Sequence, residues 1–229
     1  MKLFPTVEIL AQATNTEVLS ARSGLGYNSR GLRVKQAAEK IVSCHSGLDP
    51  ESLNDKVDTE TSSVWHNLFP TTYEDLIALP GVGDYVASAI LAFAYNEDVA
   101  VIDTNIRRIL IHQFKLDEKT SLKDLKAVAL EILPRGYARE WYNALMDYGA
   151  LELTAKRSGI RPTTRQSKFE WSRRQVRAWI VKQLVDGKDI TMINIQKRFS
   201  DRDDVQSIID ELIKENVIEY INEKFLIKD

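Results

Sequence analysis

The sequence predicts a mainly α-helical protein in which a larger helical domain is followed by a small α+β domain. Three observations support this fold class. Apolar residues recur at helical spacing in several segments, and proline and glycine interrupt that spacing at 80–83. Alternation of apolar and polar residues, which is typical of strands, is found at the end of the chain, over 217–227. A chain of 229 residues, 44% of them hydrophobic, is long enough to bury a core and fits two domains.

A short helix is predicted to begin near Thr71. Thr71 and Glu74 are spaced as a capping box, in which each side chain accepts a hydrogen bond from the backbone of the other. We expect this helix to stop at Leu79, because the following residue, Pro80, disfavours helical geometry before it.

The five residues Leu79, Pro80, Gly81, Val82 and Gly83 are predicted to form a tight hairpin. Both glycines lack a side chain, so the chain can turn sharply there and bring its N–H groups close to an anion. The anion would lie at the start of the next helix, where the helix dipole favours negative charge. A plain turn between two helices has the same sequence pattern, and both interpretations remain open at this point.

The helix after the hairpin is predicted to begin near Asp84 and to be buried, because it is apolar nearly all round. An extended apolar run, Val99 to Ile102, comes next and leads to Asp103. Asp103 precedes residues at helical spacing and is therefore predicted to cap that helix, a role worth about 0.5–2 kcal/mol. A capping carboxylate can also be a functional one, particularly when it follows a phosphate-binding hairpin.

These residues resemble the helix-hairpin-helix (HhH-GPD) DNA glycosylase superfamily that includes endonuclease III. The likeness is greatest to its adenine glycosylase, or MutY-type, branch, and it covers roughly residues 3 to 155. Besides the hairpin and the aspartate, further stretches match in the same order, namely Phe4 to Val7, Gly24 to Tyr27, Arg30, Ala37 to Ala38 and Met146 to Ala150.

The resemblance implies roles for single residues. Asp103 would be the catalytic aspartate, and the hairpin Leu79 to Gly83 would bind DNA phosphates. A monovalent cation, K⁺ or Na⁺, would be held by the hairpin carbonyls of Leu79 and Val82. The residues implied to contact DNA outside the hairpin are Tyr27, which would probe or wedge near the extruded base, and Arg30, Asn105 and Arg108.

Tyr85 distinguishes between the activities of this superfamily. Bifunctional members have a lysine at this place, whose amine attacks the sugar and leads to strand cleavage. The phenol of Tyr85 resembles instead the monofunctional enzymes, which remove a mismatched base by water attack. Tyr85 and Asp103 are therefore the predicted catalytic residues, with Asp103 stabilising the positive charge that develops on the sugar. Adenine opposite 8-oxoguanine or guanine is the expected substrate, and thymine is the alternative.

Two features of the sequence depart from this family pattern. The helix that carries the catalytic glutamate of the family has no counterpart here, because the chain begins just after the place where it would lie. The four cysteines of the usual iron-sulfur cluster are also missing, since Cys44 is the single cysteine; we therefore expect no 4Fe-4S cluster. A non-catalytic DNA-binding protein and a truncated, inactive remnant of a glycosylase are the alternatives.

The sequence predicts three successive regions. Residues 1–157 form the glycosylase domain, with a polar insertion at about 43–63 that is expected to be an exposed loop. Residues 158–170 form a basic linker whose positive charge can bind DNA. Residues 171–229 show helix, short β-prone segment, two helices and a terminal hairpin, which resembles a winged-helix domain.

The expected partners follow from this organisation. Double-stranded DNA with a mismatched or damaged base pair is the predicted ligand. The helix at 204–216 is acidic, so the winged domain is almost as well suited to a protein partner as to DNA. The apolar start around Phe4 is short and broken by Pro5, and no run is long enough to span a membrane. We expect a cytoplasmic protein, associated with the nucleoid if its source is prokaryotic.

Overall fold

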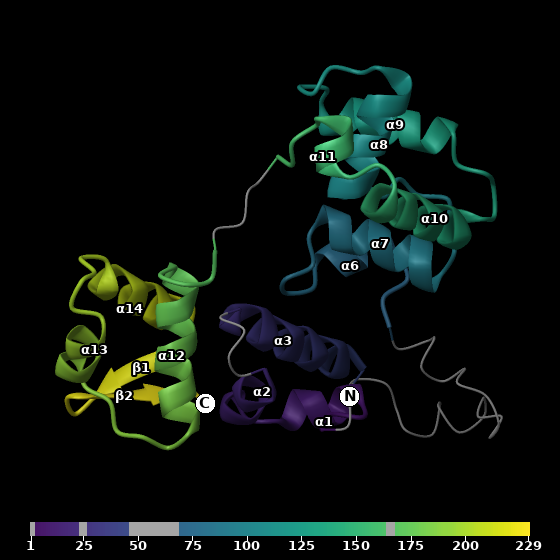
Figure 1. Ribbon diagram of the computed structural model, residues 1–229. Coiled ribbons are helices and arrows are strands. Elements are labelled where there is room, and N and C mark those ends of the chain that lie inside the picture. Colours follow the sequence, from purple (N-terminus) through teal and green to yellow (C-terminus); the bar gives the residue numbers. More distant parts are fainter. Residues whose placement is uncertain (1–2, 23–26, 46–68, 164–167) are drawn as a thin grey trace, which may run out of the picture. The chain divides into compact units, whose positions relative to one another are not determined.

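The computed structural model describes residues 3–22, 27–45, 69–163 and 168–229 (Figure 1). Its contacts divide the chain into two compact units. Unit 1 combines residues 1–69 with 167–229, and unit 2 consists of residues 70–166. The predicted fold class is confirmed, because helices dominate both units and the strands of the described residues are confined to one two-stranded sheet near the C-terminus.

Unit 1 joins helices from both ends of the sequence. Among its described residues, three helices come from the N-terminal part of the chain, and three helices and two strands come from the C-terminal part. They are α1 (Val7–Gln12), α2 (Asn15–Ala21), α3 (Asn28–His45), α12 (Arg173–Val185), α13 (Met192–Arg198), α14 (Val205–Lys214), β1 (Ile218–Ile221) and β2 (Lys224–Ile227).

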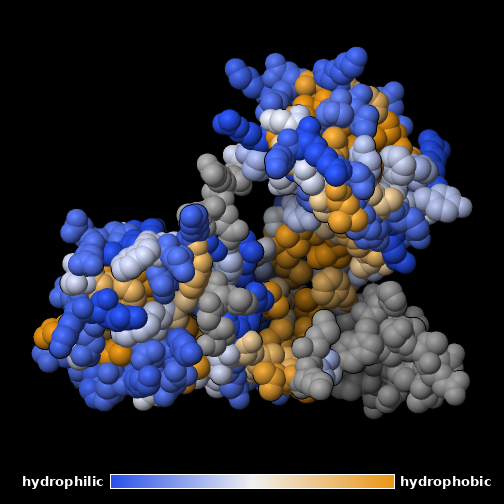
Figure 2. Space-filling view, in the orientation of Figure 1, coloured by the Kyte–Doolittle hydropathy of each residue, from blue (hydrophilic) through white to orange (hydrophobic). Residues whose placement is uncertain are grey.

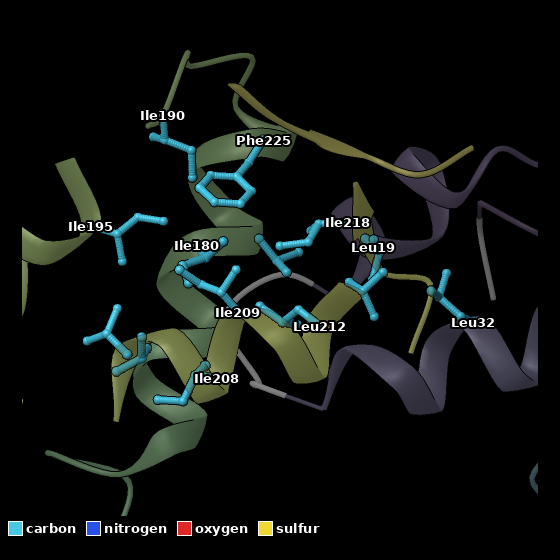
Figure 3. Close-up of a cluster of buried hydrophobic side chains, with 14 of the residues drawn as sticks. Leu19, Leu32, Ile180, Ile190, Ile195, Ile208, Ile209, Leu212, Ile218 and Phe225 are labelled. Atoms are coloured by element: carbon cyan, nitrogen blue, oxygen red, sulfur yellow. The ribbon is translucent and has the colours of Figure 1, made fainter. Parts of the chain in front are cut away.

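One hydrophobic core connects the two parts of unit 1 (Figure 3). Leu19 of α2 and Leu32 of α3 are buried in the same cluster as Ile180 of α12 and Ile208 and Leu212 of α14. The predicted boundary between a domain ending at 157 and a second one beginning at 171 is therefore not a boundary between separate cores. The N-terminal helices bury their apolar faces against the C-terminal module.

The terminal hairpin forms as the alternating sequence predicts. β1 and β2 pair antiparallel, with Ile218 opposite Ile227, and the connecting residues Asn222 and Glu223 both have positive φ, at 48° and 64°. Two-residue hairpin turns require such angles because their twist then matches that of the strands. The Phe225 N–H donates to the Ile190 carbonyl at 3.3 Å, which attaches β2 to the segment between α12 and α13. Three helices followed by a hairpin agree with the pattern predicted from the sequence, and the winged-helix assignment stays a prediction.

Ion pairs connect α12 to α14 in unit 1. Arg173 contacts Asp204 at 2.8 Å and Glu211 at 2.9 Å, while Arg177 pairs with Glu211 at 3.5 Å and also with Glu215. Two of the basic residues near the predicted linker are thus neutralised within the unit. Figure 2 shows the surface over α12 to α14 as mainly hydrophilic.

Unit 2 is a helical unit with its own core. That core contains residues from α7, α8, α9 and α10, including Ala92, Ile106, Leu110, Leu125 and Tyr142. The helices of the unit are α6 (Tyr73–Ile77), α7 (Asp84–Ala94), α8 (Thr104–Phe114), α9 (Leu122–Glu131), α10 (Ala138–Leu151) and α11 (Ala155–Ser158).

Two local predictions need correction. The cap of α6 is Thr72, whose hydroxyl accepts from the Asp75 N–H at 3.2 Å, so the predicted capping box of Thr71 and Glu74 is one residue too early. Helix α7 is not buried all round, because Tyr85 and Val86 of its first turn are 44% and 38% exposed.

The predicted insertion at 43–63 falls largely outside the described residues. Its first three positions, 43–45, belong to the last turn of α3 rather than to a loop. None of the helices in the described ranges has both the length and the apolar character needed to cross a bilayer.

Candidate active site

The predicted hairpin is a tight turn between α6 and α7. The Val82 N–H donates to the Leu79 carbonyl at 3.1 Å, and Gly81 has φ +81°. Proline at the second position and a positive φ at the third are the requirements of a type II turn. Pro80 and Gly81 therefore determine the turn through their own backbone chemistry, and a residue with a side chain at 81 would be strained.

Gly83 caps α7 without using a side chain. Its backbone is extended, with φ −104° and ψ 179°, and no side chain accepts from the first N–H groups of the helix. A Cβ built on Gly83 would meet no atom of the protein within 4 Å. Packing therefore does not require glycine here. Its absence of a side chain leaves the uncapped N–H groups open to an anion from outside.

A hydrogen-bonded network holds the first residue of α7. Asp84 accepts from the Tyr73 hydroxyl of α6 at 2.8 Å and from the Lys126 ammonium of α9. The Lys126 ammonium holds the pKa of the Asp84 carboxyl below its usual value, and the Tyr73 hydroxyl acts in the same direction. In return, its hydrogen bond to the carboxylate raises the pKa of Tyr73. Three helices thus meet at the base of the hairpin.

Asp103 is the N-cap of α8, as the sequence predicts. Its Oδ1 accepts from the Ile106 N–H at 2.6 Å, and the residues before it, Ala100 and Val101, are buried. Among the described residues, no donor reaches the second carboxylate oxygen, Oδ2. The cap fixes the position of the carboxyl group, while one oxygen stays available for a ligand.

Asp103 and Tyr85 line the same pocket, whose volume is about 430 Å³. Tyr85 comes from the first turn of α7 and Asp103 from the start of α8, so the two predicted catalytic residues are brought together by the hairpin and the extended segment between the helices. Burial raises the pKa of the Tyr85 phenol, and the Asp103 charge raises it further. The phenol is therefore neutral at ordinary pH. The other residues of the lining are Ile102, Thr104, Arg107, Leu122 and Thr163.

Asn105 and Arg108, both predicted to contact DNA, connect α8 to α10. The guanidinium of Arg108 is buried and donates to the Gly149 and Leu153 carbonyls and to Asn105 Oδ1, each at 2.6 Å. Arg108 therefore satisfies carbonyls at the end of α10. The predicted DNA contacts of these two residues remain predictions, and their observed partners lie inside unit 2.

Gly149 belongs to the Met146 to Ala150 stretch on which the family resemblance partly depends. A Cβ on Gly149 would lie 2.8 Å from the Asn105 Cβ and 3.2 Å from Ile109 Cδ1. This glycine therefore allows α10 to approach α8 directly beside the Asp103 cap.

Tyr27 and Arg30 belong to unit 1. The Arg30 guanidinium lies over the Tyr27 ring, 4.6 Å from its centre, and Arg174 of α12 donates to the Tyr27 hydroxyl at 2.9 Å. Phe169 lies beside the same arginine. The predicted DNA probe is thus surrounded by two cations, which suits an aromatic ring that meets an anionic ligand. Its role as a DNA probe remains a prediction.

Metal and cofactor ligands were also part of the predictions. The monovalent cation expected at the Leu79 and Val82 carbonyls remains a prediction, and the Leu79 carbonyl also accepts the hydrogen bond of the turn. In the ranges that the structure describes, no three His, Cys, Asp or Glu residues come together as a metal site. Cys44 lies in α3. The sequence therefore remains the basis for expecting no iron-sulfur cluster.

Sequence reasoning missed two charged residues of the site, Arg107 and Lys126. Arg107 lines the pocket one helical turn after Asp103, and that spacing of four residues could have indicated it. Lys126 is 42 residues away from Asp84 in the sequence, and no local pattern indicates their contact.

Comparisons with known proteins give a consistent family. The model of the family described as HhH-GPD superfamily base excision DNA repair protein matches residues 1–135. The adenine DNA glycosylase of Mycolicibacterium smegmatis is 35% identical over 163 residues, which are 69% of this chain and 49% of that protein. The adenine DNA glycosylase of Homo sapiens is 30% identical over 161 residues, 69% of this chain and 26% of that protein. The chain thus spans about half or less of the length of these relatives.

Solved structures show the same fold at lower identity. A thermostable thymine-DNA glycosylase matches with a TM-score of 0.54 at 21% identity, and the match covers 67% of this chain and 63% of the glycosylase chain. A trapped endonuclease III–DNA covalent intermediate matches with a TM-score of 0.51 at 16% identity, and the match covers 71% of this chain and 65% of the endonuclease chain.

Proposed function

Because this chain belongs to the HhH-GPD superfamily of base excision DNA repair proteins, we propose that it removes a mismatched base from double-stranded DNA. Adenine opposite 8-oxoguanine or guanine is the proposed substrate, as the names of the relatives suggest. The proposed reaction is hydrolysis of the N-glycosidic bond without strand cleavage. The observation that carries the proposal is the Asp103 carboxylate, which is fixed by its cap in a pocket beside the uncapped start of α7.

DNA binding would use the start of α7. The N–H groups after Gly83 have no side-chain cap, and the space around the Gly83 Cα is open, so a backbone phosphate could accept from them. The target nucleotide must leave the base stack for its sugar to reach the pocket, at a cost of a few kcal/mol that backbone contacts repay. The first turn of α7 directly follows the hairpin and contributes Tyr85 to the pocket.

Bond cleavage leaves positive charge on the sugar. The Asp103 carboxylate would stabilise this oxocarbenium-like state, and its Oδ2 atom would orient the attacking water. Tyr85 supports cleavage without lyase chemistry, because a neutral phenol has no amine to form a Schiff base with the sugar. The apolar lining residues Ile102 and Leu122 would exclude other water from the pocket.

A second candidate function is DNA binding without catalysis. Of the residues that line the pocket, Asp103 is the only carboxylic acid, so this lining offers no second acid to protonate the departing base. General acid catalysis of that kind contributes about 10²–10⁴-fold to a rate. A chain that binds a mismatch and does not cleave it would fit this composition.

Base release from defined duplexes tests the proposal. The chain is incubated with duplexes that contain adenine opposite 8-oxoguanine, adenine opposite guanine or thymine opposite guanine, and abasic sites are then revealed by alkali. We expect release of adenine and no strand cleavage before the alkali treatment.

The matched control is Asp103→Asn. Asparagine caps a helix about as well as aspartate, so the unfolding temperature should change little while base release is lost. Release equal in the two proteins would reject the enzymatic proposal, and retained mismatch binding without release would favour the second candidate. Release of thymine in place of adenine would correct the proposed substrate.

A further inference from the structure

Arg107 is a positively charged residue in the lining of the pocket. It follows Asp103 by one turn of α8, and its guanidinium donates to the Arg161 carbonyl at 3.4 Å and to the Glu118 carbonyl. Side chains four residues apart on a helix lie on one face, with about 5–6 Å between their Cβ atoms. Arg107 and Asp103 therefore line the same pocket, and the guanidinium of Arg107 is held by two hydrogen bonds.

The two partners of Arg107 hold its charge without neutralising it. Both acceptors are backbone carbonyls, and within the described part of the chain no carboxylate lies at ion-pair distance from the guanidinium. Arg173 and Arg177 of unit 1 differ in this respect, because each contacts two carboxylates. A guanidinium has five N–H donors, so several remain for a ligand.

An anion is the ligand that this arrangement fits. Guanidinium groups bind phosphate through two parallel hydrogen bonds, and a group already held by carbonyls loses little freedom when it does so. A nucleotide whose sugar meets Asp103 carries its flanking phosphates within a sugar's width of the reacting carbon. Because Arg107 lines the same pocket as Asp103, its guanidinium is the positive group of that lining that one of these phosphates could meet.

We propose that Arg107 binds a phosphate that flanks the extruded nucleotide and so positions the sugar against Asp103. This inference rests on the proposed function, because it assigns a role within the same pocket. Arg107 is then a positioning residue, and its contribution is electrostatic. The carbonyl contacts to Glu118 and Arg161 keep the guanidinium in place before DNA arrives.

Binding to a duplex with a tetrahydrofuran abasic-site analogue tests this assignment without any chemistry. Dissociation constants of the full chain are measured at several salt concentrations, for the unchanged protein, Arg107→Gln and Arg107→Lys. We expect Arg107→Gln to weaken binding about tenfold, the loss of a charge-assisted hydrogen bond. The slope of log K against log salt should fall by about 0.9, as for one phosphate contact. Arg107→Lys keeps the charge and should keep the slope.

Arg139→Gln is the matched control. Arg139 also donates to two backbone carbonyls, those of Phe93 at 2.6 Å and Ala94 at 2.9 Å, and it does not line the pocket. Its loss therefore removes the same number of carbonyl contacts and the same charge from another place in unit 2. We expect the salt slope of this variant to match that of the unchanged protein.

Three results would overturn the inference: an unchanged slope in Arg107→Gln, an equal fall in Arg139→Gln, or a fall in Arg107→Lys as large as in Arg107→Gln. Failure of the proposed function has a different signature. If the protein releases no base but the salt slope falls in Arg107→Gln, the chain binds phosphate through Arg107 and does not catalyse. If it releases the base and the slope is unchanged in Arg107→Gln, only the role of Arg107 is rejected. A chain that does not bind this duplex overturns the inference, and the base-release assay still decides the function.

Discussion

Asp103 combines a structural and a chemical role in one carboxyl group. One oxygen caps α8 and the residue also lines the pocket, so the hydrogen bond that caps the helix also holds the proposed catalytic group in place. Such a carboxylate needs no further residue to position it. Because one residue has both roles, the local sequence can predict the site. The signal is an apolar run that ends in an aspartate and is followed by apolar residues at helical spacing.

Two glycines of unit 2 are expected to respond differently to the same substitution. Gly149→Ala places a methyl group 2.8 Å from the Asn105 Cβ, so the helices must move apart, at a cost of about 1–3 kcal/mol. Gly83→Ala meets no protein atom within 4 Å and should lower stability by at most about 1 kcal/mol through poorer capping. It should nevertheless weaken binding of the abasic duplex about tenfold, because the methyl group obstructs the amides.

Urea unfolding and duplex binding, measured on both variants, check this pair of expectations. Equal losses of stability would show that the open space at Gly83 is not preserved in solution. Undiminished binding by Gly83→Ala would remove the hairpin amides from the proposed DNA contact.

At the scale of elements, the Asp84 network joins α6, α7 and α9 where the proposed phosphate site begins. The pKa of Asp84 is lowered in the folded protein by Lys126, from a usual value of 3.8. A group with a lowered pKa stabilises the fold above its unfolded pKa, and this contribution is lost as the pH falls through the folded pKa. The stabilisation by Lys126 is therefore complete at neutral pH and disappears below pH 3.8.

Lys126→Met tests this dependence. At pH 7 the variant should be less stable than the unchanged protein by about 0.5–1 kcal/mol, a small value because the ion pair is partly exposed. The stabilities of the two proteins should converge as the pH falls below 3.8. The free energy of unfolding from urea titrations between pH 2.5 and 7 measures it, with Asp84→Asn as the control that removes the titrating group. A difference that is constant over this range would contradict the assignment.

At the scale of the whole molecule, the N-terminal helices α2 and α3 share one core with the C-terminal helices and hairpin. Leu19 and Leu32 pack with Ile180 and Leu212, although a boundary at 157 was expected to separate them. The amphipathic pattern of α2 and α3 predicts which face is buried, but it does not specify the partner. Contacts such as Asp84 to Lys126, or Arg107 to the Arg161 carbonyl, were unpredictable for the same reason, whereas the turn at Pro80 and Gly81 is determined locally.

Removing residues 171–229 tests the shared core. The remaining chain would expose Val18, Leu19 and Leu32, which are buried against the C-terminal helices, and we expect it to bind the dye ANS and to lose the cooperative unfolding of unit 1. Near-ultraviolet circular dichroism and ANS fluorescence measure this. Native-like spectra and no dye binding in the shortened chain would show that residues 1–170 fold without the C-terminal region, as the sequence suggested for the glycosylase domain.

The crossing of α8 and α10 has a mechanical consequence. Gly149 brings the two backbones together beside Asn105, and the Arg108 guanidinium of α8 binds the Gly149 carbonyl of α10 and the Leu153 carbonyl just after that helix. A relative movement of the two helices at this point would break these hydrogen bonds or press the Asn105 Cβ against α10. We therefore expect the end of α10 and the start of α8, which carries Asp103, to shift together, so that a displacement of α10 would reach the wall of the pocket.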